Sequence, residues 1–160
     1  MKAVVDIDVF TIALWDKQDD RKEHAEEVLK KIENGEIELH IPLLLFQQIH
    51  EWKHGDLATR IAEFQFKHSK ELIDVRELEN SIESETGKLV SEIIEEGMDR
   101  LENMNESDLN LVLYVSGLKL GHLITFDKKH LLNRQKELNK FLKEQELTEI
   151  EIKSPEELSS

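Results

Sequence analysis

Apolar residues recur along the chain with two periods, which predicts strands and helices in alternation. Residues 2–6 form a short apolar run and residues 36–41 (EIELHI) alternate between polar and apolar side chains, so both segments predict strands. Residues 9–14 (VFTIAL) predict a short helix, and a stripe that includes Ala25 and Ile32 predicts a second, amphipathic one. This alternation favours a mainly parallel central sheet flanked by helices, an α/β sandwich of three layers.

The remaining segments continue the same alternation. Residues 43–54 (LLLFQQIHEWKH) predict a helix, and Pro42 suits its first turn. Residues 82–104 predict one long acidic helix, and residues 128–143 predict a helix with a basic outer face. Residues 148–153 (TEIEIK) alternate again, which predicts an edge strand.

The chain is organised around residues 107–127 (SDLNLVLYVSGLKLGHLITFD). Residues 109–120 are apolar on nearly every face, so they predict a buried helix, and residues 122–126 (HLITF) predict a short strand. Asp108 precedes this helix and Asp127 follows this strand. Both carboxylates are therefore expected at the rim of a core.

Aspartates also follow the first predicted strand, at Asp6 and Asp8. Because ligands bind beyond the carboxyl ends of parallel strands, Asp6, Asp108 and Asp127 are expected to meet there. Clustered carboxylates repel one another, and a divalent cation with hard oxygen ligands, Mg²⁺ or Mn²⁺, relieves that repulsion. Taken singly, each of these aspartates could instead cap a helix or begin a turn.

Composition narrows the functional classes. The chain has 160 residues, 35% of them charged, with a formal net charge of -14, which argues against a simple basic clamp for nucleic acid. A metal ion bound to the acids would make the local charge positive, so the composition is still compatible with a nucleic-acid enzyme. The chain has no cysteine, and its apolar runs fall short of the roughly 20 residues that a membrane helix needs. We expect one domain over residues 1–158, soluble and cytoplasmic, with no membrane partner.

Four segments together resemble a PIN domain, the nuclease fold of VapC-type toxins. They are VVDIDVF, IPLLLF, DLNLVLYVSGLKLGHLITFD and IEIKSPEEL, and their order covers most of the chain. The resemblance implies a Mg²⁺- or Mn²⁺-dependent endoribonuclease that hydrolyses RNA with a metal-activated water. It also implies an antitoxin protein as a partner and a homodimer. Asp6 matches the first acid of the family, Asp127 the last, and Thr125 the hydroxyl residue two positions before it.

The sequence departs from the family at two acidic positions. Gln47 or Gln48 stands where the second acid is expected, and Glu51 lies one helical turn further on. Asp108 or Asn110 occupies the third position, depending on the alignment. These departures keep open a second reading, a PIN-like binding module with weak or no catalysis.

The predicted site residues follow from these arguments. The predicted metal ligands are the aspartates Asp6, Asp8, Asp108 and Asp127. The predicted catalytic residues are Asp6, Asp108, Asp127 and Glu51. The residues predicted to contact the substrate are Thr125 and the cations after Asp127, namely Lys128, Lys129 and Arg134.

One further pattern, His50-Glu51-x-x-His54, matches the zinc-protease pattern HExxH, in which two histidines bind zinc and the glutamate acts as general base. Lys53 inside the pattern and Gly55 directly after it argue against such a small zinc metalloprotease. An exposed polar helix face is the favoured interpretation. The histidines outside this pattern show no shared spacing and are expected mostly at the surface; they are His24, His40, His68, His122 and His130.

Overall fold

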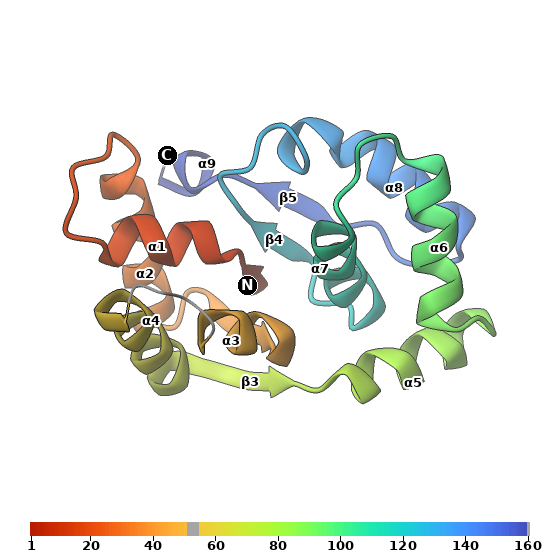
Figure 1. Ribbon diagram of the computed structural model, residues 1–160, viewed down its shortest axis with the longest axis horizontal. Coiled ribbons are helices and arrows are strands. Elements are labelled where there is room, and N and C mark those ends of the chain that lie inside the picture. The colour runs from red at the N-terminus through yellow and green to blue at the C-terminus, as the bar shows by residue number, and fades with distance from the viewer. Residues whose placement is uncertain (51–54, 160) are drawn as a thin grey trace.

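The computed structural model describes residues 1–50 and 55–159. In this part of the chain, five parallel strands form one sheet in the order β3-β2-β1-β4-β5. The strands are β1 (Lys2–Val5), β2 (Glu38–Pro42), β3 (Ser69–Ile73), β4 (His122–Ile124) and β5 (Glu151–Lys153). Helices flank the sheet, so the predicted α/β class is confirmed (Figure 1).

The helices pack in two groups. In the first group, α1 packs against α2 and α4, and α2 packs against α9. In the second group, α5 and α6 both pack against α7. The bounds are α1 (Ile7–Leu14), α2 (Lys22–Glu33), α3 (Leu43–His50), α4 (Gly55–His68), α5 (Val75–Thr86), α6 (Val90–Arg100), α7 (Glu106–Gly117), the 3-10 helix η1 (Leu132–Arg134), α8 (Gln135–Glu144) and α9 (Pro155–Ser159). Within the described residues, every helix is too short or too polar to span a bilayer.

The strand order places a crevice at the carboxyl end of β1. From β1 the chain adds β2 and then β3 on one side, and later adds β4 and β5 on the other. Val5 pairs with Ile124 across β1 and β4, and the Asp6 N–H donates to the Ile124 carbonyl at 2.9 Å. Asp6 and the residues after Ile124 therefore leave the sheet side by side, where helices diverge to opposite faces.

Helix α7 is the buried helix that the sequence predicted. Its buried residues are Leu109, Leu111, Val112, Leu113, Tyr114, Val115, Ser116 and Gly117. Two glycines let neighbouring helices approach α7 closely. A Cβ on Gly117 would lie 2.9 Å from side-chain atoms of Leu78 and Ile82 of α5, and a Cβ on Gly97 of α6 would lie 2.7 Å from Leu109. The close packing holds α7 and its first turn in place beside the sheet.

The structure corrects two helix predictions. Residues 82–104 do not form one helix, because α5 ends at Gly87, which has a φ of +72°, and α6 begins separately at Val90. The predicted helix over residues 128–143 begins only with η1 and α8, after a turn at residues 128–131. In addition, Pro42 is the last residue of β2 rather than part of the following helix.

Candidate metal centre

Asp6 lies where β1 passes directly into α1, and both of its carboxylate oxygens are engaged. Oδ1 accepts the Ile7 backbone N–H at 2.8 Å, which caps α1, and Oδ2 accepts the Thr125 hydroxyl at 2.9 Å. Burial raises the pKa of Asp6 most strongly, the bonds from Thr125 and Ile7 oppose that rise, and the charge of Asp127 adds to it. The two hydrogen bonds thus fix the orientation of the carboxylate, while burial disfavours its ionised form.

Thr125 connects the two strand ends. Its hydroxyl donates to Asp6 and accepts the Asp127 backbone N–H at 3.0 Å, while its own N–H donates to the Lys153 carbonyl at 3.0 Å. The Thr125 side chain is fully buried. Thr125 therefore orients Asp6 and Asp127. Because it is buried, it lies away from the surface that a substrate would contact.

Asp8 lies in the first turn of α1 and faces the segment after β4. Its Oδ2 accepts the Phe126 N–H at 3.2 Å and the Thr125 hydroxyl at 3.4 Å. Its Oδ1 is buried and has no hydrogen-bond partner among the residues that the structure describes. Burial, followed by the charge of Asp6, raises the pKa of Asp8 to about 7. A buried carboxylate oxygen without a donor is the kind of atom that a cation would satisfy.

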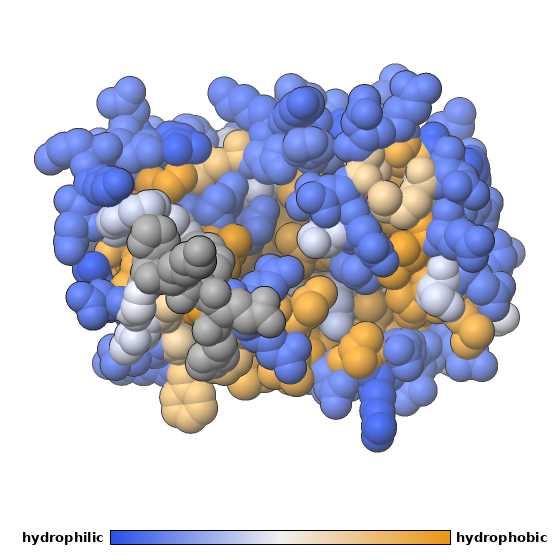
Figure 2. Space-filling model, viewed as in Figure 1, coloured by the Kyte–Doolittle hydropathy of each residue, from blue (hydrophilic) through white to orange (hydrophobic). Residues whose placement is uncertain are grey.

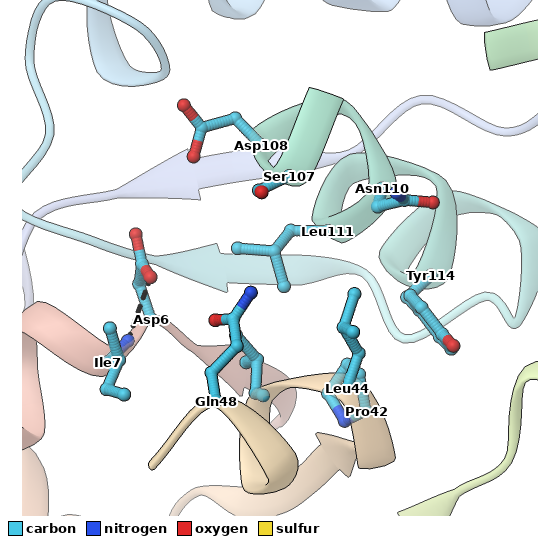
Figure 3. A pocket seen from close by; sticks show the side chains of 11 residues that line it. Asp6, Ile7, Pro42, Leu44, Gln48, Ser107, Asp108, Asn110, Leu111 and Tyr114 are labelled. Atoms are coloured by element: carbon cyan, nitrogen blue, oxygen red, sulfur yellow. Dashed lines mark hydrogen bonds between the residues drawn. The ribbon is translucent and has the colours of Figure 1, made fainter. Parts of the chain in front are cut away.

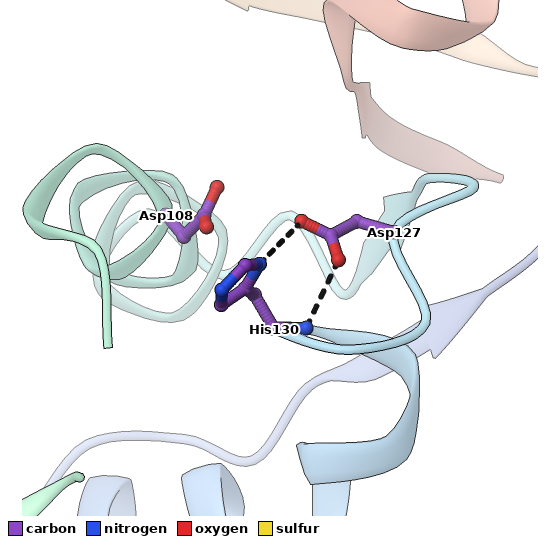
Figure 4. Close-up of side chains that lie close together, drawn as sticks. All are labelled: Asp108, Asp127 and His130. Carbon is purple, nitrogen blue, oxygen red and sulfur yellow. Dashed lines mark hydrogen bonds and ion pairs between the residues drawn. The ribbon is translucent and has the colours of Figure 1, made fainter. Parts of the chain in front are cut away.

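Asp108 and Asp127 come together with a histidine that the sequence analysis assigned to the surface. One potential ligand atom from each of Asp108, Asp127 and His130 lies within 4.8 Å of the other two. In Figure 4 the Asp127 carboxylate and the His130 imidazole both point toward the first turn of α7, which carries Asp108. The available signal was the spacing of His130, three residues after an aspartate at a strand end, where a turn returns its ring to that aspartate.

Hydrogen bonds within the turn fix the position of His130 relative to Asp127. Asp127 Oδ1 accepts the His130 backbone N–H at 2.9 Å, and Asp127 Oδ2 lies 3.3 Å from His130 Nδ1. Burial raises the pKa of Asp108 to about 6, the charges of Asp6 and Asp127 add to the rise, and His130 opposes it. These mutual effects show that the acids from β1, α7 and β4 share one electrostatic environment.

A cavity of about 180 Å³ lies between Asp6 and Asp108, walled by α1, α3 and α7. Figure 3 shows the Gln48 side chain rising from α3 toward this space, while Gln47 is exposed. Gln48 therefore occupies the place where the family resemblance implies an acid. Asn110 also lines the cavity, on the side of Tyr114, whereas the Asp108 carboxylate lies with Asp127. Of the two candidates for the third position, Asp108 is the one that joins the acids.

Two predictions fall on residues outside the described part of the chain. Glu51 is one of them, and the His50-Glu51-x-x-His54 pattern is the other, because Glu51 and His54 are both outside it. Neither the catalytic role predicted for Glu51 nor the zinc-protease alternative is tested by the structure.

The predicted basic residues divide into two kinds. Lys128 and Lys129 are exposed in the turn directly after Asp127. Arg134 is mostly buried, with 13% of its side chain exposed, and its guanidinium donates to Glu137 at 2.9 and 3.1 Å. Because a turn separates them from α8, the lysines do not continue a basic helix face. Within the described part of the chain, neither lysine takes part in an ion pair, so both are accessible next to Asp127.

The residues present fit a divalent cation. Four aspartates supply hard oxygen atoms, and the pKa is raised for Asp6, Asp8 and Asp108. Within the described residues, no lysine or arginine forms an ion pair with any of the four, and only His130 pairs with Asp127. The charge of Arg21 interacts with Asp8 without forming an ion pair, so a bound cation would offset the negative charge of this cluster.

Comparison with known proteins finds a likeness in structure alone. No protein-family model and no curated protein sequence matches the chain. The structure is similar to a chain in the crystal structure of VapBC2 from Rickettsia felis bound to a DNA fragment from their promoter, at 12% sequence identity and a TM-score of 0.55. The likeness covers 96% of this chain and 98% of that one. The chain has a PIN-like fold. The sequence resemblance is thereby supported at the level of the fold.

Proposed function

We propose that the protein is a Mg²⁺- or Mn²⁺-dependent endoribonuclease of the PIN type. The observation that carries the proposal is that Asp108 of α7 and Asp127 after β4 lie together at the crevice, with Asp6 after β1 close enough for its charge to raise the pKa of Asp108. None of the three has a lysine or arginine ion-pair partner in the described chain. These aspartates, with Asp8 behind them, would hold the ion. When bound, Mg²⁺ or Mn²⁺ would lower the pKa of a water and offset negative charge on the scissile phosphate.

The residues of the chain have separate tasks in this proposal. Thr125 fixes the directions of Asp6 and Asp127, so that the site needs little rearrangement when an ion binds. Lys128 and Lys129 would attract the phosphate backbone of RNA toward Asp127, which offsets the long-range repulsion from a chain of net charge -14. Gln48 would contribute an uncharged amide where an additional carboxylate would bind metal more strongly.

Cleavage of a labelled single-stranded RNA by the full chain tests this proposal. We expect cleavage that needs Mn²⁺ or Mg²⁺, that stops in EDTA and that falls at least about 100-fold in Asp127→Asn and Asp6→Asn. Asp16→Asn is the matched control, because Asp16 is an exposed aspartate paired with Arg60. Cleavage that survives EDTA, or that persists in Asp127→Asn, would contradict the proposal.

A PIN-like module without catalysis is the second candidate function, and Gln48 is the observation that favours it. A site with one carboxylate fewer binds a divalent cation more weakly. This candidate predicts that neither Mn²⁺ nor Mg²⁺ raises the melting temperature and that RNA stays intact. Thermal melting of metal-stripped protein, titrated with each ion, separates the two candidates, because an ion that binds only the native state stabilises it.

A protein partner of the antitoxin kind is also part of the proposal. Two observations support it: the VapBC2 structure that resembles this chain, and a hollow of about 460 Å³ between α5, α6 and α7, lined by both polar and apolar side chains. Figure 2 shows the orange, apolar side chains of this face in that hollow, inside a hydrophilic rim. Val75 and Leu89 line it, with 47% and 50% of their surface exposed. Light scattering of the full chain, alone and with a candidate partner, would measure both homodimer and complex.

A further inference from the structure

The candidate metal centre contains a nitrogen donor. The set of atoms within 4.8 Å of one another includes His130 together with Asp108 and Asp127, whereas the predicted ligand set was carboxylate oxygen throughout. All three side chains are partly buried, so the ring is neither a free surface group nor enclosed in the core. An imidazole at this place changes which ions the site would favour.

The position of His130 is set by the backbone rather than by chance contact of a flexible side chain. Its N–H donates to Asp127 Oδ1 at 2.9 Å. The Asp127 carbonyl accepts the Leu132 N–H at 2.9 Å, and the Lys128 carbonyl accepts the Asn133 N–H at 2.9 Å. These bonds close the turn over residues 127–133 and bring the ring back toward Asp127 and Asp108 (Figure 4).

Ligand chemistry distinguishes the ions. Mg²⁺ is a hard cation that takes oxygen ligands and retains much of its water. Imidazole nitrogen binds the later first-row ions most strongly, and Mn²⁺, at the weak end of that series, also prefers oxygen but accepts nitrogen more readily than Mg²⁺ does. Two carboxylates and one imidazole therefore make a mixed donor set, in which Mn²⁺ gains a ligand that Mg²⁺ uses poorly.

We propose that His130 is a direct ligand of the ion held by Asp108 and Asp127, so that the site prefers Mn²⁺ to Mg²⁺. This inference rests on the proposed function, since it assumes a metal at that site, and it adds the identity of the ion and of one ligand. In the competing arrangement His130 is a protonated counter-ion that neutralises the two acids and leaves when metal binds.

Pulsed electron paramagnetic resonance of Mn²⁺ bound to the full chain separates these arrangements. A directly bound imidazole couples its nitrogen to the Mn²⁺ spin, and uniform ¹⁵N labelling changes the coupling pattern in a known way. We expect this coupling in the wild-type protein and its loss in His130→Asn. We also expect Mn²⁺ affinity to fall at least about tenfold in that variant, while Mg²⁺ affinity changes less than about threefold.

His122→Asn is the matched control. Its Nε2 lies 3.3 Å from Glu151 Oε2, the same separation as in the His130 pair, but at the opposite, amino end of β4. Nitrogen coupling and Mn²⁺ affinity are expected to be unchanged in this variant. Circular dichroism of both variants establishes that each is folded.

The outcomes separate this inference from the proposed function. Mn²⁺ that binds the wild-type protein without nitrogen coupling, and is lost in Asp127→Asn, overturns the role of His130 and leaves the acidic site standing. Coupling that persists in His130→Asn also overturns that role. Absence of Mn²⁺ binding to the wild-type protein overturns both. If His130→Asn does not fold, the same measurements on His130→Gln decide the question, because this variant also removes the imidazole while keeping Asp108 and Asp127.

Discussion

Acidic residues at the carboxyl edge of the sheet and acidic residues on the outer surface have opposite electrostatic surroundings. On the surface, several arginines bind acids, and hydrogen bonds lower the pKa of each acid. These pairs are Asp16–Arg60, Asp19–Arg21, Glu137–Arg134 and Glu96–Arg100, and for Glu96 a hydrogen bond from Gln145 lowers the pKa more than Arg100 does. At the crevice, burial and like charges raise the pKa of Asp6, Asp8 and Asp108.

The difference teaches that three aspartates in the crevice share burial and like charge, whereas these surface acids have a cationic partner. Outside the crevice, burial and the neighbouring Glu71 and Asp74 also raise the pKa of Glu77. Like charges held together lower the stability of the metal-free fold. Such a local cost is typical of sites that bind a cation or carry out chemistry.

The largest expected effect is on the pH dependence of stability. The pKa rises from its ordinary value of 3.8 to about 7 in Asp8 and to about 6 in Asp108. Both groups therefore bind a proton more tightly in the folded protein than in the unfolded chain. The free energy of unfolding therefore falls as pH rises through this window, by about 3 kcal/mol between pH 5 and pH 8 after allowance for solvent screening at the half-exposed Asp108. Urea unfolding in EDTA measures this slope. Excess Mn²⁺ should reverse it, because ligands bind metal when deprotonated. An unfolding free energy that does not change with pH in EDTA would show that the pKa of these acids is not raised on folding.

Asp108→Asn should stabilise the metal-free protein at pH 8. It removes one charge facing Asp6 and Asp127, and we expect a gain of about 1 kcal/mol, after allowance for partial screening by solvent. The melting temperature should rise by about 2–4 °C in EDTA. The same variant should lose the rise that Mn²⁺ produces in the wild-type protein. A lower melting temperature in EDTA would mean that the Asp108 charge supports the fold.

Gln48→Glu should add a further carboxylate to the crevice that Asp6, Asp108 and Asp127 share. A carboxylate beside the cavity that Asp6 and Asp108 line would lower the metal-free unfolding free energy by about 0.5–1 kcal/mol at pH 8. It should raise Mn²⁺ affinity and the rate of RNA cleavage. Gln47→Glu, on the exposed side of α3, is the control and should change neither. Equal effects of both variants would remove Gln48 from the site.

Asp16→Asn should have the smallest effect. Asp16 is bound to Arg60 at 3.1 Å, but 84% of its side chain is exposed. Exposed ion pairs add little to stability, so we expect the melting temperature to change by less than about 1 °C, with or without Mn²⁺. A response to Mn²⁺ that differs from that of the wild-type protein would show that surface acids also bind the ion.

Local patterns were sufficient for the fold class and for part of the site. Buried, branched residues before Asp6 and Asp127 marked the ends of β1 and β4, and the apolar run after Asp108 marked a buried helix. These signals are local, because period and side-chain type decide strand or helix within a few residues. Acids at strand ends could therefore be assigned to one edge before any contact was known.

Tertiary structure alone decided the finer assignments. Asp108 rather than Asn110 joins the acids, and Gln48 rather than Gln47 faces them, because the packing of α7 and α3 sets which side of each helix meets the crevice. Gly87 separates α5 from α6, although one helix was predicted across residues 82–104. His130 reaches the site because Asp127 binds its backbone and turns the chain back. Each of these depends on contacts between segments distant in sequence or on a turn whose hydrogen bonds leave no period in the sequence.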